Sequence, residues 1–172
     1  MSGLKNIYLE QIAAFSELKR IKKRRIVTIA YMALVNIEQH RLRTTIKEAE
    51  DVDWFDLSRI PKLALDHNKI LELAIFKLKR RFRFEPLGFE LLPLKFSLKN
   101  LQDLYESLFG IKLDNRNFRK KLLKIGHLTE LDEKQTNVSH RSAKLYKFDK
   151  NSYKKLSENG INIDILPKAY LH

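Results

Sequence analysis

Apolar positions in the first half of the chain predict two strands, a short third strand at Asp51–Asp56 and a helix. The stretches Leu9–Phe15 and Arg25–Val35 have strand character, and the basic turn Ser16–Arg24 joins them. Because the second stretch is continuously apolar, it is expected to be a central strand that is buried on both faces. Farther on, Asp66–Arg81 carries apolar residues at helical spacing, and Asp66 is expected to cap this helix.

The second half of the chain has the rhythm of two short helices. Ser97 is the expected N-cap of the first, which ends at Gly110. After a short turn, Asp114 is the expected N-cap of the second helix, which runs to about Ile125 and is closed by Gly126. Two helices of this length joined by a short turn are typical of a helix-turn-helix.

A hairpin is expected directly after these helices. It consists of a strand around Leu128–Leu131, the polar loop Asp132–His140 and a strand at Ala143–Phe148. A hairpin in this position is the wing of a winged helix-turn-helix. Pro86 and Gly88 interrupt the apolar pattern between the first helix of the chain and the helix-turn-helix. The sequence therefore predicts an α+β chain of two parts with a boundary near residue 84.

The second helix of the pair is expected to have one apolar and one cationic face. At about 100° per residue, Phe118, Leu122 and Ile125 fall on one side, and basic residues lie opposite. Arginine and lysine pair with phosphates or guanine edges, and asparagine pairs with adenine. The residues expected to contact DNA are Asn115, Arg116, Asn117, Arg119, Lys120 and Lys124 on the helix, and His140, Arg141 and Lys144 on the wing.

Charge supports a polyanionic partner. The 172 residues include 34 Lys and Arg against 21 Asp and Glu, a formal net charge of +13. Residues 112–155 alone hold 13 basic and 5 acidic residues, so the excess is concentrated on the second helix and the wing. Double-stranded DNA is the expected partner, and a non-specific RNA or single-strand binder is the alternative that charge leaves open.

Other chemistry finds little support in the sequence. Cysteine is absent, which excludes disulfides, thiolate zinc sites and cysteine nucleophiles. The five histidines lack ligand spacing, so neither a metal nor a cofactor is expected. The apolar run Ile26–Val35 is about half the length of a bilayer span, so no membrane association is expected. One acidic cluster is expected to be a solvated loop, with a metal site as the alternative; it comprises Glu48, Glu50, Asp51, Asp53 and Asp56.

Several segments, in order, resemble one family. Arg83–Pro93 looks like the linker of the Nudix-related transcriptional regulators of the NrtR type. Leu113–Lys121 resembles their recognition helix, and His140–Phe148 resembles their wing strand. The first part of the chain is similar to the second half of a Nudix domain, an α/β/α sandwich; the matching segments are Tyr8–Gln11, Val27–Val35, Trp54-Phe55 and Asp66-His67.

The resemblance implies a function and a division of labour. Residues 1–84 would be a partial Nudix-like domain for sensing and dimerisation, and residues 85–172 a winged helix-turn-helix DNA-binding domain. It implies a cytoplasmic, homodimeric regulator of an NAD or sugar metabolism operon. The effector would be ADP-ribose or a related nucleotide-sugar or sugar metabolite.

One departure from the family pattern bears on catalysis. A Nudix hydrolase holds Mg²⁺ with the glutamates of its signature, because magnesium prefers hard oxygen ligands. These 172 residues contain no such segment, and the resemblance places Met1 about where the signature would end. The chain is therefore expected not to be an enzyme. The alternative is a Nudix-family hydrolase of ADP-ribose-like substrates whose catalytic segment is absent from this chain.

Overall fold

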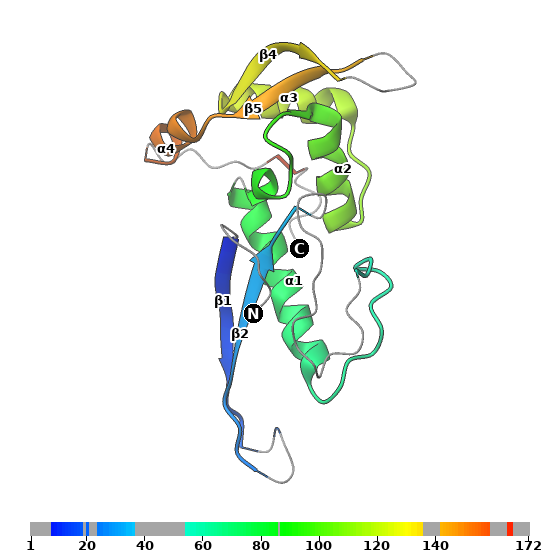
Figure 1. The fold of residues 1–172 in the computed structure, drawn as a ribbon, viewed down its shortest axis with the longest axis vertical. Helices are drawn as coiled ribbons and strands as arrows, with labels where there is room; N and C mark the ends of the chain where they lie inside the picture. The colour runs from blue at the N-terminus through cyan, green and yellow to red at the C-terminus, as the bar shows by residue number, and fades with distance from the viewer. Residues whose placement is uncertain are drawn as a thin grey trace. The chain divides into compact units, whose positions relative to one another are not determined.

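The computed structural model describes residues 8–18, 20, 24–36, 54–85, 87–135, 142–158 and 165–166. It divides into two compact units, Met1–Leu78 and Lys79–His172. The helix α1, His67–Phe84, begins in the first unit and ends in the second. Helices and strands occur together in the chain (Figure 1), which confirms the predicted α+β class.

The first unit contains an antiparallel hairpin followed by the start of α1. Its strands are β1, Tyr8–Phe15, and β2, Thr28–Leu34, and a bulge interrupts their register between Gln11 and Ala13. The strands predicted at Leu9–Phe15 and Arg25–Val35 are confirmed. The third predicted strand is not seen at residues 54–56, and the rest of Asp51–Asp56 lies outside the described residues. The predicted burial of the second strand on both faces is wrong, because the sheet of the described residues has only these two strands and leaves one face uncovered. Ile29 and Tyr31 are more than half exposed there, at 53% and 55%.

The start of α1 is fixed by an ion pair instead of the expected cap. The Asp66 carboxylate pairs with Arg20, whose Nη2 donates to Oδ1 at 3.0 Å and whose Nε donates to Oδ2. Arg20 also donates to Thr28 Oγ1 (2.6 Å) and to the Phe15 carbonyl (3.2 Å). Because a carboxylate prefers a two-pronged guanidinium to a backbone amide, Asp66 joins the helix to the hairpin. At its other end α1 runs beyond the predicted Arg81.

The second unit contains the two predicted short helices and a three-stranded antiparallel sheet of order β3-β5-β4. Its predicted strands are confirmed, and β4 is longer than expected. A last helix was not predicted, because it is short and mostly polar. The elements of this unit are the 3-10 turn η1 (Leu87–Glu90), β3 (Phe96–Ser97), α2 (Leu98–Phe109), α3 (Asn115–Ile125), β4 (Leu128–Lys134), β5 (Lys144–Phe148) and α4 (Lys150–Glu158).

The ends of α2 and α3 confirm the predicted caps. Ser97 and Asn100 form a capping box, in which the Asn100 amide donates to Ser97 Oγ at 3.2 Å and the Ser97 amide donates to Asn100 Oδ1 at 3.0 Å. The Asp114 carboxylate accepts from the backbone amide three residues later at 2.8 Å. Gly110 and Gly126 end the helices at φ of 67° and 78°, a left-handed conformation that favours glycine.

An aromatic core holds α2 and α3 together within the second unit. The Tyr105 hydroxyl on α2 donates to the Phe82 carbonyl at 3.0 Å, and the Phe82 side chain is fully buried. The Tyr105 ring meets the Phe118 ring of α3 edge to face at 5.9 Å. Other buried apolar residues of this unit are Phe96, Leu98, Leu101, Leu108, Leu113, Leu122 and Tyr146. In the described part of the chain, no helix has the length and apolar character needed to cross a bilayer.

Candidate nucleic-acid interface

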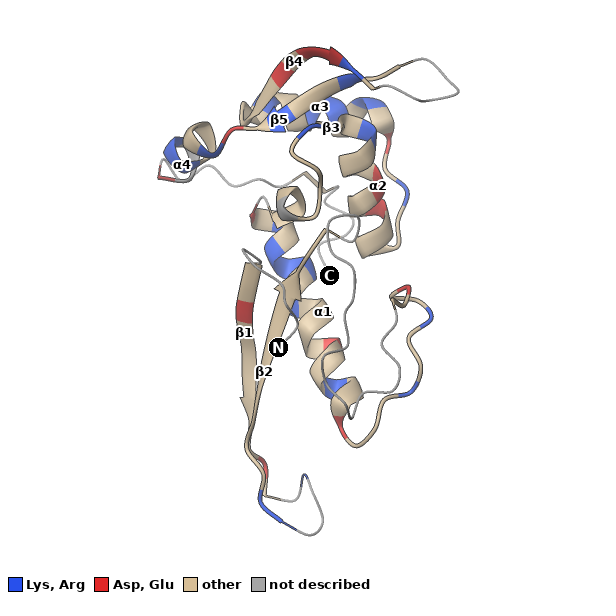
Figure 2. Cartoon of the chain, viewed as in Figure 1, with Lys and Arg blue, Asp and Glu red and all other residues tan. Residues whose placement is uncertain are grey.

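The helix α3 has an apolar face and, opposite it, a cationic face, as predicted. Phe118 and Leu122 face the core and are 3% and 0% exposed, while Ile125 is partly buried. Figure 2 colours the lysine and arginine positions of α3 blue. The predicted DNA-contacting residues of this helix are all exposed; they are Asn115, Arg116, Asn117, Arg119, Lys120 and Lys124. Their contact with DNA stays a prediction.

Four cations of α3 stand without an ion pair among the described residues. Elsewhere in this unit, Lys99 pairs with Asp103, and Lys112 pairs with Glu106. No carboxylate in the described part of the chain lies within ion-pair distance of Arg116, Arg119, Lys120 or Lys124. Because a neutralised cation adds little to phosphate binding, these four supply the available positive charge of the helix.

Lys121 is a cation of α3 with a different role. Its ammonium group donates to the Ile165 carbonyl at 3.3 Å and to the Leu166 carbonyl at 3.2 Å. The Ile165 and Leu166 side chains are themselves buried, at 3% and 2% exposed. Lys121 therefore holds a segment near the end of the chain against the helix. The sequence carries no signal for this contact, since 44 and 45 residues separate the partners.

A buried polar clamp fixes the turn between α2 and α3. Glu106 Oε1 accepts from the Leu113 amide (3.0 Å) and from Gln102 Nε2 (2.9 Å), and Gln102 Nε2 also donates to the Leu113 carbonyl (3.0 Å). Glu106 Oε2 accepts from Lys112 at 3.0 Å. The Leu113 amide, with help from Gln102 and Lys112, lowers the pKa of Glu106 to about 2. A charged Glu106 thus holds the amide of Leu113, the residue that precedes the α3 cap, and Gln102 holds its carbonyl. The clamp was not predicted, because a polar residue on a helix gives no sign that it turns inward.

The wing, defined here as β4 and β5, is less basic than expected. Figure 2 shows acidic residues along β4, and these are Glu130, Asp132 and Glu133. Lys144, a predicted DNA contact, is exposed but forms an ion pair with Glu130. The other two predicted wing contacts, His140 and Arg141, lie outside the described residues. Among the described residues, α3 therefore has more cations without an ion pair than the wing, where these are Lys134 and Lys147.

One buried histidine lies directly after the C-terminal end of α3. His127 follows the Gly126 cap, is fully buried, and lies edge to face with Phe89 at 5.5 Å and Phe148 at 5.8 Å. Neither ring nitrogen has a hydrogen-bond partner among the described residues. Burial lowers the pKa of His127 to about 4, so the ring is neutral near pH 7. Within the same described residues, no group of three or more His, Asp or Glu side chains could hold a metal ion.

A comparison with protein families identifies this arrangement. The family described as the NrtR DNA-binding winged helix domain matches residues 88–148. Residues 88–148 are therefore similar to the NrtR-type winged helix domain. The match includes the whole of α2, α3, β4 and β5, so it covers the cationic face, the clamp and the wing. The predicted resemblance to the NrtR-type, Nudix-related regulators is confirmed.

Individual relatives extend the likeness beyond the NrtR-type domain. The ADPR responsive transcriptional repressor NtrR of Acinetobacter baylyi is 32% identical over 154 residues. That alignment covers 88% of this chain but 60% of the relative, so the chain spans less than two thirds of the relative's length. The crystal structure of Shewanella oneidensis NrtR in complex with a 27mer DNA is 26% identical, with a TM-score of 0.68 over 86% of this chain and 67% of that one.

Two further structures agree on the fold. A second crystal structure of Shewanella oneidensis NrtR matches with a TM-score of 0.64 at 27% identity, over 82% of this chain and 64% of that one. A MutT/nudix family protein from Enterococcus faecalis matches with a TM-score of 0.60 at 20% identity, over 81% of this chain and 61% of that one. The likeness to a MutT/nudix protein concerns the fold alone. It accords with the fold predicted from the sequence, a Nudix-like part joined to a winged helix.

Proposed function

We propose that this chain is a DNA-binding transcriptional regulator that inserts α3 into the major groove of duplex DNA. The observation that carries the proposal is the exposed face of α3, with four cations that have no ion pair among the described residues. The helix is capped at both ends and its other face is buried, so these cations sit on a rigid support. Its first turn offers Asn115 and Asn117 for base contacts, and the N-terminal part of a recognition helix is the part nearest the bases.

The remaining parts of the regulator are proposed from the relatives. Residues 85–172 would bind DNA, and residues 1–84 would be a Nudix-like part for sensing and dimerisation. The Acinetobacter relative is named as responsive to ADPR, which supports ADP-ribose or a related nucleotide sugar as the effector. A homodimer would bring two copies of α3 to two half-sites. A regulator of this kind would act on NAD or sugar metabolism genes in the cytoplasm, and these points stay predictions.

A hydrolase stays the alternative, and no observation on the described residues favours it. The Acinetobacter relative is named as a repressor. The acidic cluster expected as a solvated loop or metal site lies outside the described residues, apart from Asp56. There the Asp56 carboxylate accepts from the amide (2.8 Å) and hydroxyl (2.6 Å) of Ser58, a local turn contact. We therefore propose regulation without catalysis.

The test is duplex binding by the full chain, followed by fluorescence anisotropy over a salt series. The duplex would come from the region upstream of the gene that encodes this chain, with a scrambled duplex beside it. Replacing Lys120 and Lys124 by Gln should reduce the magnitude of the log–log salt slope by about 1.8, since each phosphate contact contributes about 0.9. A control with the same charge change, Lys62→Gln with Lys69→Gln in the first unit, should leave the slope unchanged.

Two results would contradict the proposal. One is an equal loss of affinity in both double variants, which would mean that only net charge matters. The other is a chain that binds neither duplex at low salt. If the native duplex is preferred and α3 is required, adding ADP-ribose tests the sensing step. Altered affinity for the native duplex alone would support the proposed effector, and unaltered affinity would remove it.

A further inference from the structure

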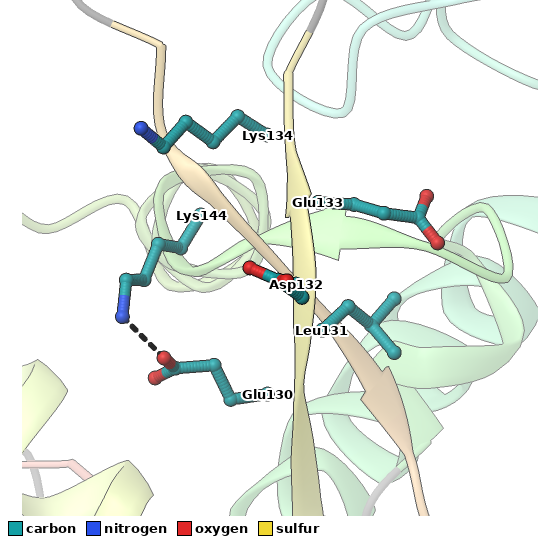
Figure 3. A pocket seen from close by; sticks show the side chains of 6 residues that line it. All are labelled: Glu130, Leu131, Asp132, Glu133, Lys134 and Lys144. Carbon is teal, nitrogen blue, oxygen red and sulfur yellow. Dashed lines mark hydrogen bonds and ion pairs between the residues drawn. The ribbon is translucent and has the colours of Figure 1, made fainter.

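The wing presents a feature that is unusual for a surface expected to meet DNA. Its first strand, β4, carries three exposed carboxylates, and they line a hollow of about 500 Å³ shown in Figure 3. The lining residues are Glu130, Leu131, Asp132, Glu133, Lys134 and Lys144. Negative charge at this place opposes phosphate binding, so its arrangement relative to the nearby lysines decides what the wing can do.

Glu130 is the carboxylate of this strand that is held from two sides. Its Oε1 accepts from Lys144 Nζ across the hairpin, drawn as a dashed line in Figure 3, and its Oε2 accepts from the Tyr146 hydroxyl at 3.1 Å. Glu130 lies directly opposite Tyr146 in the β4–β5 register. Because the Tyr146 side chain is buried, with only 4% exposed, its hydroxyl holds the Glu130 carboxylate at a rigid position of the sheet. Lys144 is thereby paired on the wing while its side chain stays 58% exposed.

Tyr146, which holds Glu130, lies within electrostatic range of one α3 cation, Arg119. Burial raises the pKa of the Tyr146 phenol, as does Glu130, while Arg119 of α3 opposes them and lowers it. The Arg119 guanidinium is therefore close enough to act on the residue that holds Glu130. Lys144 lowers the pKa of Glu130, so the carboxylate is ionised at neutral pH. Both partners of the ion pair are therefore charged near pH 7, where DNA binding would be measured.

We propose that Glu130 sets the affinity of the wing for DNA by competing with phosphate for Lys144. Glu130 acts as an internal substitute for a phosphate group, and Lys144 reaches the DNA backbone only by exchanging one anion for another. Phosphate contacts carry no base information, so the effect applies to duplexes of any sequence. The result is a regulator whose sequence-independent affinity is held down while the base contacts of α3 are unaffected. The inference rests on the proposed function.

The decisive variant is Glu130→Gln, which keeps the shape and the hydrogen-bond acceptor for Tyr146 but removes the charge. It should bind native and scrambled duplexes more tightly by a similar factor. One added phosphate contact should steepen the salt slope by about 0.9, which makes the gain about 3.5-fold larger at 50 mM than at 200 mM salt. An unchanged thermal midpoint would show that the wing remains folded.

The matched control is Glu133→Gln. Glu133 is on the same strand, has the same side-chain exposure of 49% as Glu130, and pairs with Lys95 instead of Lys144. It removes the same charge, so it measures the general electrostatic effect. A double-mutant cycle with Lys144→Gln then isolates the pair: the gain from Glu130→Gln beyond that of Glu133→Gln should vanish when Lys144 is absent.

Each outcome decides the question. A gain specific to Glu130 that requires Lys144 supports the inference. A gain that persists in the Lys144→Gln background, an equal gain from Glu133→Gln, or no gain overturns it. If these results occur while Lys120 and Lys124 remain essential for binding, the inference alone fails. If wild type binds no duplex, both the inference and the proposed function fail.

Discussion

Truncating Phe118 tests which face of α3 is anchored in the core. The Phe118 ring is 3% exposed and meets the Tyr105 ring at 5.9 Å, and Tyr105 is in turn hydrogen-bonded to the Phe82 carbonyl. Replacing a buried Phe by Ala removes its transfer free energy and leaves a cavity, at a cost of about 3–5 kcal/mol. About 0.5–1.5 kcal/mol of this cost is the lost edge-to-face contact between the two rings. We expect Phe118→Ala to lower the free energy of unfolding by an amount in the range of about 3–5 kcal/mol.

The assay is urea unfolding followed by far-UV circular dichroism. Tryptophan fluorescence is unsuitable, because the single tryptophan, Trp54, lies in the first unit and is 45% exposed. The control is Leu123→Ala on the same helix, where the side chain is 46% exposed and the cost should be below about 1 kcal/mol. If Phe118→Ala cost no more than Leu123→Ala, the assigned core face of α3 would be wrong.

Two further predictions concern acid stability, measured as urea midpoints against pH. The pKa of Glu106 is about 2 in the folded chain against an ordinary 4.5, so its contribution to the free energy of unfolding is complete above pH 4.5 and is lost as the pH falls toward 2. Glu106→Gln should remove the pH dependence of stability between these values. An unaltered pH profile would refute the clamp. The pKa of His127 is about 4 in the folded chain against an ordinary 6.5, so on acidification the unfolded chain binds the proton first. The free energy of unfolding should therefore fall by about 3 kcal/mol as the pH drops from 6.5 to 4. His127→Leu should abolish that loss, and a His127→Leu protein with the same pH dependence would show that another group titrates.

The parts of the fold that could be predicted from sequence are those whose signals are local. The ends of α2 and α3 follow from Ser97, Gly110, Asp114 and Gly126, each of which acts within four residues along the chain. The two faces of α3 follow from helical periodicity. The recognition helix, its cationic face and the hairpin after it could therefore be predicted from the order of the amino acids alone.

The parts that could not be predicted depend on partners that are distant in sequence. Asp66 has the sequence of a helix cap, yet Arg20, 46 residues away, takes its carboxylate. Lys144 is a predicted DNA contact, and its ion pair with Glu130 on the neighbouring strand could not be predicted from the sequence. The helix α4 was missed because it is short and mostly polar. The contacts of Asp66 and Lys144 thus depend on partners that the residue type does not reveal.

The central claim is that the cationic face of α3 is the surface that meets duplex DNA. The most direct measurement is an NMR titration of the ¹⁵N-labelled chain with the upstream duplex, following backbone amide shifts residue by residue. We expect the largest changes in Asn115–Ile125, with smaller changes in the wing and none in the β1–β2 hairpin that exceed those caused by salt. Changes concentrated in the hairpin, with the amides of α3 unmoved, would contradict the claim.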